Sequence, residues 1–241
     1  MGRYVVHAAR DAGHEVVVIS RRSGVDATSP ESLSHALTGV DVIVDAADAA
    51  TTSRRKATAF FAGVTANLQS VGAARGVSRL VTLSIVGLEQ LGFGYYAAKS
   101  SQEKAALAGP LPGCIVRATQ FYEFPSKILS RFGLGPVAFM PVMRIQPVAA
   151  RAVGAYLAEV ATTATPATTV EVAGPDEQDL VAMARAVLRH RQRRVAVVPL
   201  WIPGRAGTAM RGGGLLPSSD ARIIGPSFAQ WLASGGSNAS S

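Results

Sequence analysis

Short apolar runs, each about the length of a β-strand, recur along this chain and alternate with helical patterns. Glu15 to Ser20, Val40 to Asp45 and Thr168 to Ala173 are three of these runs. An uninterrupted apolar run of this length is typical of a strand buried on both faces of a parallel sheet. Amphipathic segments such as 3–12 and 51–75 lie between the runs. The alternation predicts a doubly wound α/β fold, in which ligands bind at the carboxyl ends of the strands.

The length and composition of the chain indicate how many hydrophobic cores it can form. With 241 residues, of which 48% are hydrophobic, the chain can bury one substantial core without dividing into independent domains. We expect residues 1–233 to form one domain, in which the portion from about 121 to 233 covers the substrate. The last residues, 234–241, are rich in Gly, Ser and Asn and are expected to be a disordered tail.

The number of cysteines and the hydropathy of the sequence predict the cellular compartment of the protein. A single cysteine, Cys114, excludes a disulfide within the chain, and a reducing compartment is expected. The sequence shows neither the pattern of a signal peptide nor an apolar stretch of about 18 residues, so we expect a cytoplasmic protein without a membrane partner. The four histidines lack the spacing of zinc ligands, and no metal site is expected.

The charge of the chain suits an anionic partner. The formal net charge is +8, and dinucleotide phosphates or nucleic acid would both qualify. The basic residues do not form an aromatic-interleaved strip or a recognised reading helix, so no nucleic acid is expected. The densest basic run, Arg185 to Arg194, falls at the predicted end of a helix, where cations complement the helix dipole and remain solvated.

Three polar side chains meet between two apolar runs in the stretch 79–123. Ser84 ends the first run, and Tyr95 and Lys99 follow at a spacing of four. Residues four apart share one face of a helix, so a helix opening at Tyr95 places its phenol and the Lys99 ammonium one turn apart. A nearby cation lowers the pKa of a tyrosine, as a phenolic general acid or base requires. The alternative is an exposed helix start with a packed tyrosine and a solvated lysine.

These residues carry a family resemblance. Ser84, then Tyr95-x-x-x-Lys99, then Arg117-Ala-Thr-Gln-Phe121 resembles an atypical short-chain dehydrogenase/reductase of the NmrA-like, NAD(P)H-binding kind, over most of the chain. The resemblance implies a Rossmann-like sheet with a small C-terminal α/β appendage. It also implies that Tyr95 acts as the acid/base, that Lys99 lowers its pKa and binds the nicotinamide ribose, and that Ser84 orients the substrate oxygen.

The amino-terminal residues depart from the family pattern. A dinucleotide-binding fold opens with a strand and a glycine-rich turn before its first helix, whereas this sequence opens in the helix, with Gly2 resembling the last glycine of the motif. In the family the absent strand lies between the runs at 15–20 and 40–45. We expect the natural reading frame to begin upstream of Met1. The alternative is a truncated chain whose sheet closes up or takes a strand from elsewhere.

The resemblance also places residues around the cofactor. Arg21 and Arg22 follow the run at 15–20, where an acid would select NAD and arginine accommodates the 2′-phosphate of NADP, so NADP is favoured over NAD. Two exposed arginines after a strand are the plain alternative. The resemblance implies a further set of cofactor-binding positions, namely Gly2, Asp26 near the adenine, Ala46 and Ala47 after the run at 40–45, Lys99 and Thr119.

The sequence therefore predicts an NADP-dependent oxidoreductase that transfers hydride to or from a carbonyl, an alcohol or a related small molecule, with Tyr95 as acid/base. A non-catalytic NAD(P)H-binding sensor or regulatory protein of the NmrA-like type is the alternative, although such a sensor has no need of Ser84, Tyr95 and Lys99. A monomer or a homodimer is expected.

Overall fold

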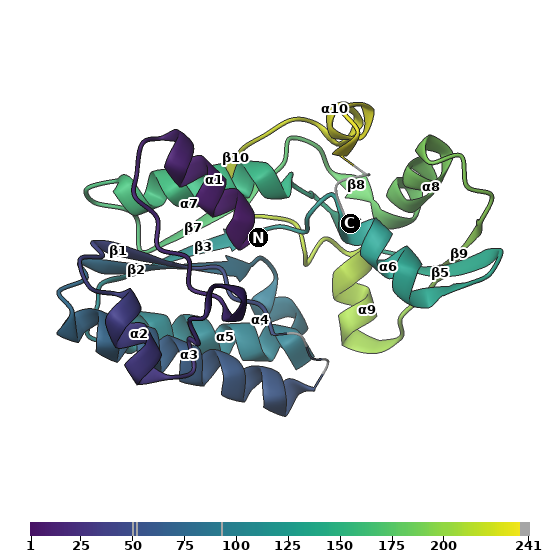
Figure 1. The fold of residues 1–241 in the computed structure, drawn as a ribbon. Coiled ribbons are helices and arrows are strands. Elements are labelled where there is room, and N and C mark those ends of the chain that lie inside the picture. Colours follow the sequence, from purple (N-terminus) through teal and green to yellow (C-terminus); the bar gives the residue numbers. More distant parts are fainter. Residues whose placement is uncertain (50, 52, 93, 237–241) are drawn as a thin grey trace. The chain divides into compact units, whose positions relative to one another are not determined.

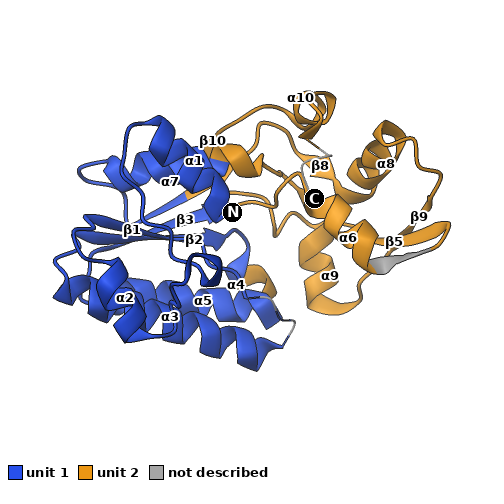
Figure 2. Cartoon of the chain, viewed as in Figure 1, with its two compact units in different colours: residues 1–88, 92–117, 153–170 blue, residues 89–91, 118–152, 171–241 orange. Residues whose placement is uncertain are grey.

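The computed structural model describes residues 1–49, 51, 53–92 and 94–236, and the chain forms two compact units (Figure 2). The first comprises residues 1–88, 92–117 and 153–170, and the second comprises residues 89–91, 118–152 and 171–241. Residues 153–170 thus return to the first unit. Of the predicted disordered tail, residues 237–241 lie outside the described residues.

The first unit contains most of the helices and strands that the apolar runs predict. Its elements in chain order are α1 (Gly2–Asp11), η1 (Arg21–Ser23), α2 (Pro30–Ala36), β1 (Val42–Asp45), α3 (Arg54–Ala74), β2 (Arg79–Ile85), α5 (Gly94–Ala108), β3 (Gly113–Ala118) and most of α7 (Ala150–Thr162). Helix α2 begins where the sequence predicts, because the Ser29 hydroxyl accepts a hydrogen bond from the Ser32 amide and Pro30 occupies the first helical position.

The central sheet has five parallel strands in the order β1-β2-β3-β7-β10, with β7 at Thr169–Ala173 and β10 at Arg222–Ile223. Helices α2, α3 and α5 lie on one side of the sheet in the first unit, and α1 and α7 lie on the other (Figure 1). Buried side chains from the sheet and its helices form a core cluster that includes Leu33, Leu37, Ile43, Val64, Leu68, Leu80 and Ile115. The predicted doubly wound, Rossmann-like α/β fold is confirmed.

The strand predicted at 15–20 is wrong. Residues 14–19 belong to no strand, and Val17 and Val18 are 49% and 36% exposed. An apolar run becomes a strand only where a neighbour pairs with its backbone groups, and among the described residues no strand pairs with this run. The run is followed by the short helix η1, which Ser20 caps. The sheet therefore begins at β1.

Helix α1 packs closely on α7. Its end is set by Gly13, whose φ of 83° is a conformation that glycine adopts readily. On α7, a Cβ atom added to Gly154 would lie 2.5 Å from the Tyr4 Cβ and 2.8 Å from the Tyr4 carbonyl carbon. Only glycine at position 154 leaves room for the backbone of α1 at this distance.

The second unit has its own small sheets and helices. Its elements are α4 (Leu88–Leu91), α6 (Phe124–Phe132), β4 (Gly133–Leu134), β5 (Val137–Pro141), β6 (Arg144–Ile145), β8 (Gln178–Asp179), α8 (Leu180–His190), β9 (Ala196–Leu200), α9 (Gly204–Arg211) and α10 (Phe228–Ala233). Helices α6 and α8 pack on the sheet β4-β5-β9. Tyr122 is buried against the rings of Phe228 and Trp231, and its hydroxyl donates to the Pro226 carbonyl oxygen at 2.8 Å.

No helix among the described residues is both long and apolar enough to span a membrane.

Candidate functional site

Tyr95 and Lys99 lie in the first two turns of α5, as their spacing predicts. Both contact the Phe61 ring on α3. The Tyr95 ring meets Phe61 edge-on, with 5.8 Å between ring centroids, and the Lys99 Nζ lies 4.8 Å from the Phe61 centroid. Phe61 is fully buried. The two side chains therefore rest on one apolar support, with a cation–π contact on the lysine side.

The Tyr95 phenol is paired with a carboxylate. Its Oη donates a hydrogen bond to Asp48 Oδ1 at 2.8 Å. Burial raises the pKa of Tyr95, and the charge of Asp48 and its hydrogen bond with the phenol raise the pKa further. This direction is opposite to the one predicted from the Tyr95 and Lys99 spacing. The nearest charge to the phenol is an acceptor, so Tyr95 is held as a protonated hydrogen-bond donor.

The Lys99 ammonium is buried and forms hydrogen bonds within the protein. Only 3% of the residue is exposed, and its Nζ donates to the Leu83 carbonyl oxygen and to Gln102 Oε1, each at 2.6 Å. Gln102 Nε2 in turn donates to Asp45 Oδ2 at 2.7 Å. Burial lowers the pKa of Lys99, while the charges of Asp45, Asp48 and Glu103 oppose that lowering. The ammonium thus ties α5 to β2 directly, and Gln102 links α5 to the end of β1.

Two buried hydroxyls lie at or just after the carboxyl ends of strands β2 and β3. Ser84, near the end of β2, is 1% exposed, and Thr119, which follows β3, is 2% exposed. Neither Ser84 Oγ nor Thr119 Oγ1 has a hydrogen-bond partner among the described residues. Burying a hydroxyl without a hydrogen-bond partner destabilises the folded protein, and a bound ligand can supply that partner. Binding sites in open α/β sheets lie at the carboxyl ends of the strands. In the first unit, the Ser84 hydroxyl is therefore free to bond to a polar ligand at the carboxyl end of β2.

The first turn of α1 is suited to an anion. Gly2 opens the helix, no side chain caps it, and its first turn contains no acidic residue. A Cβ atom added to Gly2 would meet no atom within 4 Å. The helix dipole at such an end favours phosphate oxygens.

The predicted adenosine side consists of surface residues. Arg21 and Arg22 lie in η1, and both are exposed. The Asp26 carboxylate accepts hydrogen bonds from the amide and the hydroxyl of Thr28, and these bonds and the charge of Arg21 lower its pKa. The turn before α2 thus accounts for Asp26, and the Arg21 guanidinium acts on that carboxylate through its charge.

Ala46 and Ala47 lie directly after β1 and are half-buried. The Ala47 amide donates to Asp45 Oδ1 at 2.9 Å, so the strand ends in a tight turn held by its own carboxylate. The turn leads to Asp48, the partner of Tyr95. That Ala46 and Ala47 let a cofactor approach the backbone stays a prediction.

The sequence matches no family model and no curated protein. Its structure resembles a large set of solved structures. An NADPH-dependent quinone oxidoreductase from Escherichia coli, in complex with NADPH, matches with a TM-score of 0.70 and 15% identity, over 97% of this chain and 95% of that one. A short-chain dehydrogenase/reductase superfamily protein from Agrobacterium tumefaciens with bound NAD matches with a TM-score of 0.70 and 16% identity, over 97% and 92% of the two chains.

A triphenylmethane reductase from Citrobacter sp., in complex with NADP(H), matches with a TM-score of 0.62 and 14% identity, over 84% of this chain and 79% of that one. The chain has the fold of these proteins. Identities at this level show the shared Rossmann-like architecture, and the chemistry of this chain has to be inferred from its own residues.

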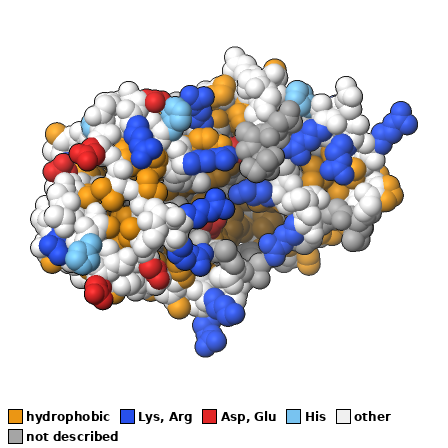
Figure 3. All heavy atoms as spheres, in the orientation of Figure 1, with side chains coloured by type: hydrophobic (Ala, Val, Ile, Leu, Met, Phe, Trp, Pro, Cys, Tyr) orange, Lys and Arg blue, Asp and Glu red, His pale blue; other side chains and the backbone are white. Residues whose placement is uncertain are grey.

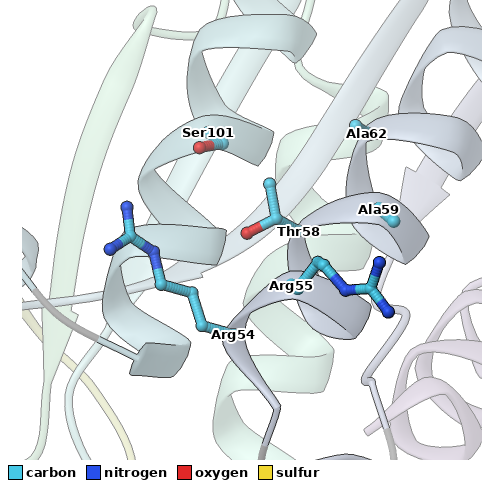
Figure 4. Close-up of a pocket in the computed structure, with 6 residues that line it drawn as sticks. All are labelled: Arg54, Arg55, Thr58, Ala59, Ala62 and Ser101. Carbon is cyan, nitrogen blue, oxygen red and sulfur yellow. The ribbon is translucent and has the colours of Figure 1, made fainter.

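A separate hollow of about 600 Å³ lies between α3 and α5. It is lined by Arg54, Arg55, Thr58, Ala59, Ala62 and Ser101, and includes none of the predicted site residues. Figure 4 shows the side chains of Arg54 and Arg55 pointing in different directions, so they do not form a single clamp for an anion. Figure 3 shows basic side chains spread over one face of the molecule, in keeping with the net charge of +8.

Sequence reasoning missed the polar partners of the catalytic candidates. Asp45, Gln102 and Asp48 are the residues that hold Lys99 and Tyr95. The signal that points to two of them is the acidic pair in Asp45-Ala-Ala-Asp48 at the end of an apolar run, because carboxylates at a strand end in this fold face the ligand side.

Proposed function

We propose that this protein is an NADP-dependent oxidoreductase of the short-chain dehydrogenase/reductase type, related to the NmrA-like kind. The observations that support the proposal are the hydrogen bond that keeps the proton on the Tyr95 phenol and the buried, unpartnered Ser84 hydroxyl near the carboxyl end of β2 in a Rossmann-like sheet. Similar structures that bind NADPH or NADP(H) and reduce quinones or dyes support it.

The residues present fit the cofactor in part. The first turn of α1 would hold phosphate oxygens, Arg21 and Arg22 would pair with the 2′-phosphate, and Ala46 and Ala47 would allow the backbone to approach the adenosine. When bound, NADPH supplies the hydride.

Side chains of the protein then orient the substrate oxygen and donate a proton to it. Ser84 Oγ would donate to a carbonyl oxygen and orient it, and Tyr95 would donate its proton to that oxygen as negative charge develops there. Lys99 acts from inside the protein, by holding α5 against β2 and by bonding to Gln102, which in turn bonds to Asp45 at the end of β1. In this arrangement Lys99 positions Tyr95 and does not need to touch it.

Replacing both Arg21 and Arg22 by Ala is expected to weaken NADPH binding by about tenfold or more and to leave NADH binding nearly unchanged. Each guanidinium gives charge-assisted hydrogen bonds to a phosphate that only NADPH carries. Fluorescence titration with both nucleotides measures the two dissociation constants. Arg193 and Arg194, an exposed adjacent pair after α8, provide the matched control. Equal losses for NADPH and NADH would remove the 2′-phosphate assignment.

A further inference from the structure

The charged group bonded to the Tyr95 phenol is a carboxylate. Asp48, which follows β1, is exposed and lies 2.8 Å from the Tyr95 hydroxyl. The Lys99 ammonium, the cation expected at this place, is withdrawn beneath the surface and bonded to Leu83 and Gln102. A molecule that approaches Tyr95 therefore meets a carboxylate first.

The other charged groups near Tyr95 do not cancel Asp48. Asp45 at the end of β1 is buried and bonded to Gln102. Glu103 on α5 is neutralised by Arg117 on β3, with two hydrogen bonds of 2.9 and 2.7 Å. This leaves the two carboxylates Asp45 and Asp48 facing the single ammonium of Lys99, and their charges act on both Lys99 and Tyr95.

This arrangement discriminates between kinds of hydride acceptor. A neutral carbonyl or quinone develops negative charge on oxygen as it accepts hydride, and a carboxylate beside that oxygen opposes the change. A cationic acceptor, such as an iminium or triarylmethyl ion, loses its positive charge instead. Its binding is favoured by a carboxylate, and its reduction requires no proton from Tyr95.

We propose that Asp48 is a specificity-determining residue that makes the Tyr95 site selective for a delocalised organic cation as the hydride acceptor. The inference rests on the proposed function, since it names the substrate class for the same hydride transfer. The step balances without another reactant: the acceptor carbon gains a C–H bond and two electrons from NADPH, its positive charge is cancelled, and NADP⁺ is released.

The test compares a permanent cation, N-methyl dihydroisoquinolinium, with the neutral quinone menadione. Asp48→Asn keeps an oxygen for the Tyr95 hydrogen bond and removes the charge, whereas Asp48→Glu keeps the charge. Asp41→Asn removes an exposed carboxylate just before β1 and is the control. Calorimetric titration of each protein with the cation measures binding without cofactor, and NADPH oxidation measures turnover with each acceptor.

We expect Asp48→Asn to weaken binding of the cation by about two- to fivefold, the effect of losing one solvent-exposed ion pair. Its KM for the cation should rise in parallel, while turnover of menadione should increase. The Asp48→Glu and Asp41→Asn variants should bind the cation as the unaltered chain does. Unchanged binding of the cation by a folded Asp48→Asn protein would overturn the proposal.

Failure of this inference is distinguishable from failure of the proposed function. If the cation binds in a manner that depends on Asp48 but no acceptor is reduced, the carboxylate selectivity stands and the oxidoreductase assignment is wrong. If NADPH is oxidised by menadione and both acceptors are unaffected by Asp48→Asn, the oxidoreductase assignment stands and the selectivity is wrong.

Discussion

Replacing Tyr95 by Phe is expected to lower turnover of a neutral quinone or carbonyl by about a hundredfold or more, while the affinity for NADPH stays nearly unchanged. A positioned general acid contributes roughly 10²- to 10⁴-fold to such a step. The Phe ring keeps the edge-on contact with Phe61 and loses only the hydroxyl that donates to Asp48. Steady-state turnover and NADPH titration measure the two quantities separately.

Tyr96→Phe removes a hydroxyl from the next residue of α5 and is the matched control. Unchanged turnover in Tyr95→Phe would exclude the phenol from the reaction. A cationic acceptor needs no proton, so its reduction should be far less sensitive to this substitution. Comparison of the two acceptors therefore shows whether the Tyr95 hydroxyl acts on the proton or only on the shape of the site.

Arg117→Met is expected to reduce the free energy of unfolding by about 3 kcal/mol, because it leaves the Glu103 carboxylate buried without its partner. Glu103 is 7% exposed, and its two oxygens accept hydrogen bonds from the Arg117 guanidinium at 2.9 and 2.7 Å. The pair joins α5, which carries Tyr95, to β3. A loss of this size is a large fraction of the roughly 5–15 kcal/mol that stabilises a typical domain.

Urea denaturation measures the effect, and the double variant Glu103→Leu/Arg117→Met provides the control. Replacing a buried ion pair by apolar residues is often close to neutral, so the double variant should recover most of the stability. A double variant as unstable as Arg117→Met would show that the contacts of the arginine stem, and not the unpaired carboxylate, account for the loss.

Local signals in the sequence predict most of the fold. Each run that became a strand has its hydrogen-bonding partner in another such run, as β1 has in β2, where Val42 pairs with Arg79 and Asp45 with Thr82. The start of α2 at Pro30 follows from one serine cap, and the position of Tyr95 in the first turn of α5 follows from the i, i+4 pattern. The run at 15–20 has the same composition and remains outside the sheet, because composition does not supply a pairing partner.

The candidate site is less predictable because its decisive contacts are distant in sequence. Tyr95 and Asp48 are 47 positions apart, and Gln102 and Asp45 are 57 positions apart. The spacing of Tyr95 and Lys99 places both on one face of a helix but does not specify that the ammonium turns inward to Leu83. The sequence therefore identifies the reactive residue types, whereas the sign of the charge next to Tyr95 depends on tertiary packing.

The measurement that tests the central claim most directly is a fluorescence titration of the folded chain with NADPH, with a circular dichroism spectrum to verify the fold. A Rossmann-like sheet whose helix α1 and arginines bind the dinucleotide predicts saturable binding of NADPH that is tighter than the binding of NADH. A folded chain that binds neither nucleotide would contradict the oxidoreductase assignment and would indicate a scaffold that keeps the fold without the cofactor.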